Sequence, residues 1–217
     1  MTPRNTRLST KVCIRRLRTL LFACACLLFS FGGALPASAQ PQETAVFAGG
    51  CFWGVEAVFR HVRGVTQAVS GYSGGRADTA HYDQVSGGDT GHAESVLVRF
   101  NPAQVSFDQL LQVFFLVAHD PTQRDRQGPD VGSQYRSVIF YAAADQQEIA
   151  QRTIRQFTQA RTFPDRIVTQ VVPLQQFHPA EAYHQNYVAL HPREPYVVFN
   201  DLPKLLELRR QFPDMFR

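Results

Sequence analysis

The chain has 217 residues, 44% of them hydrophobic and 18% charged, with a formal net charge of +4 at pH 7. The basic balance comes from residues 1–39, which hold six of the 22 basic residues and none of the 18 acidic ones. Residues 40–217 therefore carry 16 basic against 18 acidic residues, a net charge of −2. Because this part keeps Lys204 as its single lysine and shows no basic stripe, the composition excludes a nucleic-acid-binding protein.

Residues 1–39 predict a cleaved secretory signal peptide. Basic residues are followed by an apolar run over 20–35 and then by Ala37-Ser38-Ala39. The apolar run is shorter than the ~20 residues that a membrane-spanning helix needs. We expect cleavage after Ala39, one domain over 40–217, and a periplasmic or secreted protein.

The same boundary decides which cysteines remain in the mature protein. Cys13, Cys24 and Cys26 all lie in the predicted leader, so Cys51 is the single cysteine of residues 40–217. An exported chain with one cysteine forms no internal disulfide. Its thiol is either protected by burial or kept for chemistry.

Hydrophobic periodicity predicts an α+β fold. In chain order the elements are strand 44–49, helix 52–62, strand 65–72, strand 94–100, helix 106–118, strand 136–142, helix 145–160 and strand 166–173. The first six follow the order βαββαβ of the ferredoxin-like motif, a sheet with helices packed on one face. Beyond them we expect an extended C-terminal segment.

Two helix starts have local support in the sequence. Ser106 with Gln109, and Asp145 with Glu148, match the spacing of an N-cap residue and its acceptor three positions later. Core-facing stripes follow each start, namely Leu110, Phe114 and Val117 in the first helix and Ile149, Thr153 and Phe157 in the second.

Two long connections, 73–93 and 119–135, interrupt this framework. Both are rich in Gly, Asp, Tyr and His and lack a periodicity of their own. Long loops of this kind are usually functional or disordered, and their aromatic residues argue against disorder. We therefore expect both loops to lie around Cys51.

Cys51 lies where the first strand turns into the first helix. Unpaired backbone N–H groups and the positive end of the helix dipole favour a thiolate there and predict a lowered thiol pKa. Gly49 and Gly50 allow a sharp turn, and Phe52 and Trp53 place large rings beside the sulfur. The sequence thus predicts a nucleophile, although a buried, inert cysteine is the alternative.

Carboxyl and phenol groups are available in the two loops. Glu94 ends the first loop; beside apolar rings its pKa would rise and make it a proton donor, whereas at the surface it would be an ordinary solvated glutamate. Asp130 and Tyr135 add a carboxyl and a phenol from the second loop.

The histidines do not predict a metal site. His178, His184 and His191 lack tight ligand spacing and have no cysteine pair beside them. We expect them to hold loops through hydrogen bonds. No glycine-rich dinucleotide loop follows a strand either, so no bound cofactor is expected.

Taken together, the motifs of residues 44–217 resemble those of the A-type peptide-methionine sulfoxide reductases, in the same order. They are Gly50-Cys51-Phe52-Trp53-Gly54 with Glu56, Gly71-Tyr72-Ser73-Gly74-Gly75, Thr90-Gly91-His92-Ala93-Glu94, His119-Asp120-Pro121-Thr122, Gln134-Tyr135-Arg136-Ser137 and Tyr183-His184-Gln185.

The resemblance implies reduction of the S epimer of methionine sulfoxide, free or in oxidised proteins, as a protein-repair activity. It implies that Cys51 attacks the sulfoxide sulfur and becomes a sulfenic acid, while Glu94 protonates the oxygen. The remaining roles that it implies are oxygen binding by Tyr82 and Tyr135, orientation of the substrate or a water by Asp130, and binding of the S-methyl group by Phe52 and Trp53.

One departure from that family concerns recycling. Many members carry further cysteines near the C-terminus that resolve the sulfenic acid, and this chain has none there. We therefore expect an external thiol as reductant, either a thioredoxin-like or glutaredoxin-like protein or a small thiol. We also expect a monomer.

Two other functions are compatible with parts of the sequence. A secreted cysteine hydrolase would pair Cys51 with His92, His119 or His184, but no motif assigns any of them the role of a base. An aromatic-lined peptide-binding protein would keep its function when Cys51 is replaced by serine.

Overall fold

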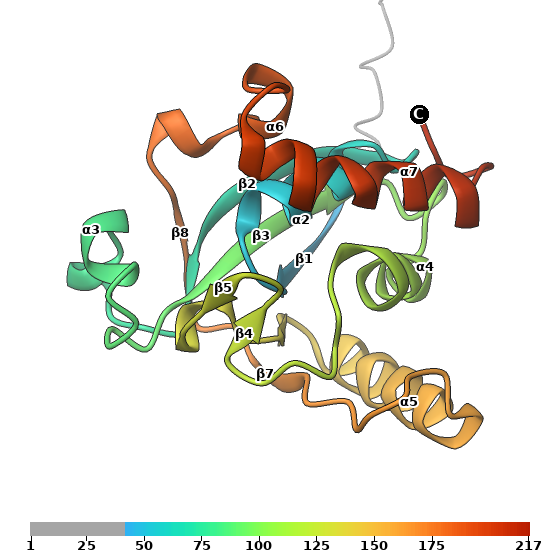
Figure 1. Cartoon of the computed structure of the whole chain (residues 1–217). Coiled ribbons are helices and arrows are strands. Elements are labelled where there is room, and N and C mark those ends of the chain that lie inside the picture. The colour runs from blue at the N-terminus through green and yellow to red at the C-terminus, as the bar shows by residue number, and fades with distance from the viewer. Residues whose placement is uncertain (1–41) are drawn as a thin grey trace, which may run out of the picture. The chain divides into compact units, whose positions relative to one another are not determined.

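The computed structural model describes residues 42–217, which form a mixed α+β unit (Figure 1). The predicted α+β class is confirmed. The predicted leader, residues 1–39, lies outside the described residues.

A six-stranded sheet with the order β7-β6-β1-β3-β2-β8 organises this unit. Its strands are β1 (Glu43–Ala48), β2 (Val65–Ser73), β3 (Ala93–Phe100), β6 (Val138–Tyr141), β7 (Gln170–Pro173) and β8 (Phe177–Pro179). All neighbours are antiparallel except β6 and β7, which are parallel. The five predicted strands are present, and β8 is an additional edge strand.

Alternating side chains of β1 divide the core between the two faces of the sheet. Phe47 belongs to the larger cluster and stacks on Phe59 of α2 (Phe52–Arg60) and Phe114. Val46 points the other way, into a small cluster with Phe140. This period of two is what a β-strand requires. The larger apolar face is covered by helices and holds the main core.

Three predicted helices pack toward that larger cluster. They are α2, α4 (Phe107–Val113) and α5 (Ala144–Ala160). The turn Phe114–Ala118 continues α4 in π-helical geometry, so the predicted helix 106–118 changes its winding near its end. The predicted stripes of both later helices face inward: Leu110 and Thr153 are fully buried, for example.

The two predicted caps have different outcomes. Ser106 and Gln109 form a complete capping box at the start of α4, as predicted. The prediction for Asp145 was wrong, because α5 begins after Ala143 without a side-chain cap. Asp145 instead accepts a hydrogen bond from the adjacent N–H of Gln146.

Both long loops contain short elements and are tied to each other. The first contains the 3-10 turn Ala77–Thr79 and α3 (Tyr82–Val85). The second contains the hairpin β4 (Arg126–Gln127) and β5 (Asp130–Val131) and the 3-10 turn Ser133–Tyr135. Gln134 Nε2 donates to the Ser86 carbonyl at 3.0 Å, and Arg136 donates to the His92 and Gly91 carbonyls.

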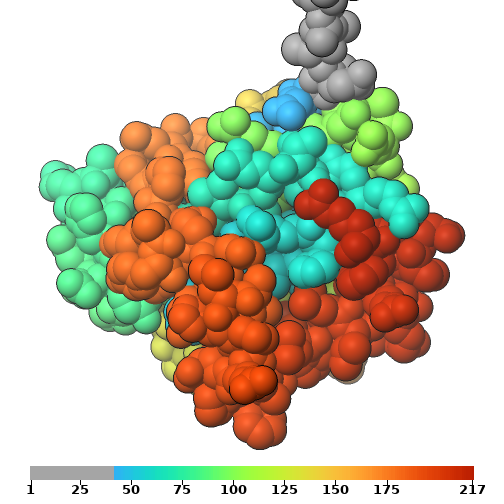
Figure 2. All heavy atoms as spheres, turned by 90° about the horizontal axis from the view of Figure 1, so that it is seen from above, coloured from blue at the N-terminus to red at the C-terminus, as the bar shows by residue number. Residues whose placement is uncertain are grey.

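The predicted extended C-terminal segment was wrong, because its later part is mostly helical. It forms a 3-10 turn (Ala182–His184), α6 (Tyr187–Leu190), a π-helical turn (Val197–Asp201) and α7 (Leu202–Gln211). Pro203 near the start of α7 and Arg209 and Arg210 at its end favour a helix at this place. α7 lies against α2, and Figure 2 shows the orange and red C-terminal residues packed beside the cyan segment.

None of the helices in the described part of the chain has both the length and the apolar character of a membrane span.

Candidate active site

A pocket of about 320 Å³ contains all seven side chains that the sequence singled out. Its lining consists of Cys51, Phe52, Trp53, Tyr82, Glu94, Asp130, Tyr135, Tyr187, Glu194 and Tyr196. These residues come from the start of α2, the start of β3, both long loops and the C-terminal segment. The prediction that the two loops lie around Cys51 is confirmed.

Cys51 is the N-cap residue of α2, and the tight turn before it depends on glycine. Gly50 has φ = +91°, a conformation that side chains disfavour, and a Cβ there would lie 2.5 Å from the Gln127 side chain. Gln127 in turn holds Asp120, with its amide bonding both the N–H and the carbonyl of that residue. These bonds hold the second loop together at the place where Gln127 packs closely on Gly50.

The predicted lowering of the thiol pKa was wrong. Cys51 is 8% exposed, and burial raises the pKa of its thiol well above the ordinary value; the charges of Glu94 and Asp201 raise it further. The N–H of Trp53 and the charge of Lys204 act in the opposite direction but do not prevail. Desolvation of the charged form therefore outweighs the helix N-terminus, and the resting group is a thiol.

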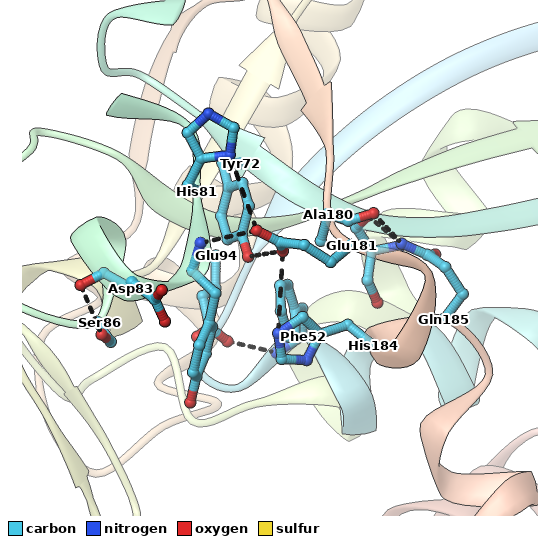
Figure 3. A network of polar contacts seen from close by, with 12 residues as sticks. Phe52, Tyr72, His81, Asp83, Ser86, Glu94, Ala180, Glu181, His184 and Gln185 are labelled. Atoms are coloured by element: carbon cyan, nitrogen blue, oxygen red, sulfur yellow. Dashed lines mark hydrogen bonds and ion pairs between the residues drawn. The ribbon is translucent and has the colours of Figure 1, made fainter. Parts of the chain in front are cut away.

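Glu94 binds a backbone N–H group at the start of α2. Its Oε2 accepts a hydrogen bond from the Phe52 N–H at 3.0 Å (Figure 3). The side chain is buried, and this burial raises the pKa of Glu94 to about 8 despite that hydrogen bond, with the charge of Asp130 adding to the rise. A carboxylic acid is consequently present at neutral pH, as the sequence predicted for a glutamate beside apolar rings.

Tyr82 and Tyr135 supply two phenols to the pocket. Tyr82 begins α3, and its N–H donates to Glu181 at 3.0 Å; Tyr135 ends a 3-10 turn. Burial raises the pKa of both phenols, and the charge of Glu94 contributes to each rise. Both groups stay protonated at neutral pH and can donate hydrogen bonds into the pocket.

Asp130 is paired with a residue that the sequence did not single out. The hydroxyl of Tyr196 donates to Asp130 Oδ2. Burial raises the pKa of Asp130, whereas Tyr196 and the charge of Lys204 lower it in part. The C-terminal segment thereby fixes the carboxyl group of the second loop.

Trp53 forms an aromatic wall with the same segment. Its ring stacks on Tyr187 with centroids 3.7 Å apart and meets Tyr196 edge-on at 5.9 Å. The indole N–H donates to His184 Nδ1 at 3.1 Å. Phe52 is almost fully buried behind the pocket, with its ring 5.0 Å from that of His184.

No histidine in the described part of the chain lines this pocket, and two of them hold other parts of the structure through hydrogen bonds. His92 bonds the Gly75 N–H and the Arg76 carbonyl, and His119 bonds the Phe114 carbonyl and Ser137. Burial lowers the pKa of His119 to about 4, so its ring is neutral at neutral pH. Within residues 42–217 no three His, Cys, Asp or Glu side chains are grouped as a metal ion would require.

Tyr187, Glu194 and Tyr196 are the pocket residues that sequence reasoning missed. They follow the Tyr183-His184-Gln185 motif, but no strand or helix pattern connects them to Cys51. Glu56 of α2 is in contact with the C-terminal segment that carries these residues. Its buried carboxylate accepts hydrogen bonds from the Asn186 N–H and the Ser70 hydroxyl. A charged residue on the buried face of a predicted helix is the available signal that another segment packs there.

Comparison with known proteins gives a consistent result. The peptide methionine sulfoxide reductase family matches residues 43–215. A peptide methionine sulfoxide reductase MsrA 2 of Mesorhizobium japonicum is 52% identical over 82% of this chain and 92% of its own. A peptide methionine sulfoxide reductase MsrA of Thermus thermophilus is 46% identical over 82% of this chain and 99% of its own.

Solved structures agree with these relatives. Reduced Mxr1 of Saccharomyces cerevisiae has a TM-score of 0.66 at 29% identity, covering 74% of this chain and 92% of Mxr1. Methionine sulfoxide reductase A of Corynebacterium diphtheriae has a TM-score of 0.62 at 35% identity, covering 71% and 77% respectively. On the sequence match over residues 43–215 and these likenesses, the chain belongs to the peptide methionine sulfoxide reductase family.

Proposed function

We propose that the protein reduces the S epimer of methionine sulfoxide, free or in oxidised proteins, by direct attack of Cys51 on the sulfoxide sulfur. The observation that carries the proposal is the joint presence of the Cys51 thiol, the Glu94 carboxyl and two phenols in one pocket. The choice of epimer rests on the motif resemblance.

The resting protonation states suit this reaction. Glu94, with its pKa near 8, holds a proton at neutral pH and donates it to the sulfoxide oxygen, while Tyr82 and Tyr135 donate hydrogen bonds to the same oxygen. Charge that develops on the oxygen is then stabilised by groups that are already in place. The substrate methyl group fits against Phe52 and Trp53, where apolar and sulfur contacts are favourable.

The first half-reaction balances without another reagent. The Cys51 sulfur attacks the sulfoxide sulfur and finally carries the oxygen, so thiol plus sulfoxide gives sulfenic acid plus methionine. Glu94 gives a proton to the oxygen and regains the proton that leaves Cys51. Cys51 is oxidised by two electrons, and the sulfoxide is reduced by two.

Recycling requires a thiol from outside the chain. Cys51 is the only cysteine within residues 42–217, so no described residue can form a disulfide with it. An external thiol attacks the sulfenic acid, forming a mixed disulfide and water, and a second thiol releases Cys51 as a thiol. The donor class is a thioredoxin-like or glutaredoxin-like protein or a small thiol.

A single-turnover experiment tests this function. Reduced enzyme is mixed with each epimer of methionine sulfoxide in the absence of thiol, and methionine and the mass of Cys51 are measured. We expect one methionine per enzyme from the S epimer and a gain of one oxygen on Cys51. Cys51→Ser serves as the control and forms none; methionine formed equally from both epimers would contradict the proposed selectivity.

The same reagents distinguish the hydrolase alternative. A peptide that carries methionine sulfoxide loses one oxygen if the protein is a reductase and is cleaved if it is a cysteine hydrolase. No histidine lines the pocket among the described residues, which supports the reductase.

For location and assembly, we propose an exported monomer with its signal peptide removed after Ala39. The basic and apolar blocks of residues 1–39 support this location. N-terminal sequencing of protein recovered from the periplasm tests it, and light scattering tests the monomer. For the fold, we propose a ferredoxin-like core, supported by the antiparallel order β6-β1-β3-β2.

A further inference from the structure

We propose that Glu181 is a positioning residue of the reductase pocket, acting on Trp53 through His184 and on Tyr82 directly. Glu181 does not line the pocket, and it lies in the C-terminal segment just before the 3-10 turn Ala182–His184. This inference rests on the proposed roles of Trp53 and Tyr82 in substrate binding.

The hydrogen bond between Trp53 and His184 fixes the protonation of the imidazole. An indole N–H can only donate, so His184 Nδ1 must accept and therefore carries no proton (3.1 Å). A neutral ring then has its proton on Nε2. Burial lowers the pKa of His184, in agreement with a neutral ring.

Glu181 is the group that favours this tautomer. His184 Nε2 is buried and has no hydrogen-bond partner within residues 42–217, and its nearest ionic neighbour is Glu181 Oε2 at 4.0 Å. A carboxylate on this side of the ring attracts the Nε2 proton and leaves Nδ1 free to accept the indole N–H. Trp53, which forms the pocket wall, is thereby held indirectly by the charge of Glu181, through His184.

The same carboxylate also holds the first loop. Its Oε1 accepts the N–H of Tyr82 at 3.0 Å. Its Oε2 accepts the hydroxyl of Tyr72 at 2.9 Å (Figure 3). Burial alone raises the pKa of Glu181, but other contacts, with the Tyr82 N–H and the Tyr72 hydroxyl among them, outweigh it and hold the pKa below the ordinary value. An ionised carboxylate is thus present throughout the neutral range. Glu181 thereby holds both proposed substrate-binding residues, Tyr82 directly and Trp53 through His184.

Nitrogen-15 NMR of the histidine rings measures the first part of this inference without substrate. In the wild type we expect His184 to be neutral with its proton on Nε2, the signal being assigned by its loss in His184→Gln. A proton on Nδ1, or a charged ring at pH 7, would overturn the inference. This measurement does not depend on whether the protein reduces any sulfoxide.

The variant Glu181→Gln tests the coupling, because it removes the charge while it keeps the length of the side chain. Trp53 is the only tryptophan of the chain, so the indole N–H signal and the intrinsic fluorescence each report this one ring. We expect an upfield shift of the indole N–H and a mixture of His184 tautomers. Asp83→Asn, an exposed carboxylate next to Tyr82, is the matched control and should leave both signals unchanged.

Kinetics complete the test. We expect kcat/KM for methionine sulfoxide to fall about tenfold or more in Glu181→Gln, as for lost hydrogen bonds to a charged group. The rate of Cys51 alkylation should stay unchanged, since Glu181 is not among the groups that shift its thiol pKa. When His184 is already replaced by Gln, the further change Glu181→Gln should decrease kcat/KM by a smaller factor. Unchanged tautomer and indole signals in a folded Glu181→Gln variant would refute the inference.

Discussion

The replacement Glu94→Gln removes the proton that Glu94 donates to the sulfoxide oxygen in the proposed reaction, while it keeps the shape of the side chain. The glutamine oxygen can still accept the Phe52 N–H, which is 3.0 Å from Glu94 Oε2 in the wild type. The start of α2 therefore keeps its hydrogen bond. We expect kcat to fall by about 10² to 10⁴, the usual contribution of a general acid.

The same replacement should stabilise the fold at alkaline pH. Burial raises the pKa of Glu94 from its ordinary value of 4.5 to about 8, so the native state binds the proton more tightly than the unfolded chain. A raised carboxyl pKa means that stability is lost as pH rises from 4.5 to 8, by at most about 5 kcal/mol. Because glutamine is neutral at every pH, the Glu94→Gln variant does not undergo this pH-dependent loss of folding stability.

Urea unfolding of both proteins at pH 5 and pH 8.5, together with a pH profile of kcat, forms the assay. We expect the variant to gain stability relative to the wild type between the two pH values, by several kcal/mol. Wild-type kcat should decrease as pH rises through about 8, because the acid loses its proton. A pH-independent stability difference, or a variant with wild-type kcat, would refute the assigned protonation state.

Three further replacements test separate parts of the structure. Gly50→Ala should destabilise the protein by about 2–4 kcal/mol in urea unfolding, because a side chain at φ = +91° is strained and would clash with the Gln127 side chain. The control Gly128→Ala, at φ = +56° with open space around it, should cost about 1 kcal/mol. Equal losses of stability in the two variants would contradict the clash. Asp201→Asn should speed alkylation of Cys51 by iodoacetamide severalfold at pH 8, because one of the charges that raise the thiol pKa is removed. Ser106→Ala should cost about 1 kcal/mol by thermal or urea unfolding through loss of the α4 cap, and no change would show that the capping box contributes nothing.

The sequence predicted five of the six sheet strands and the three large helices because each has a hydrophobic periodicity of its own. Phe47 and Val46 show the period of two, and Ser106 with Gln109 marks the start of a helix. The helical character of residues 187–211 was not predicted. The exposed Leu190 and Phe199 there do not follow a simple amphipathic pattern, and the π-helical turn Val197–Asp201 changes the period.

The site residues were predicted through motifs, whereas the electrostatics of Cys51 were not. Position at a helix start is visible in the sequence, but burial depends on segments that are far away along the chain. Asp201 and Lys204, both near the C-terminus, act on the thiol, and Tyr196 closes the pocket beside Asp130. The sign of a pKa shift follows from the sum of such contacts, so the local feature alone gave the wrong direction.

The raised pKa values of Cys51 and Glu94 have the same main cause and depend on each other. Burial is the largest cause for each group, and the charge of Glu94 is the next largest for Cys51, so the pocket is most stable when both hold a proton. A buried thiol reacts slowly with oxidants that need a thiolate. In the proposed reaction a bound sulfoxide changes this balance, because its oxygen takes the proton of Glu94 as the sulfur is attacked, and the carboxylate then receives the thiol proton. The proposal thereby couples activation of Cys51 to the presence of a substrate oxygen in the pocket.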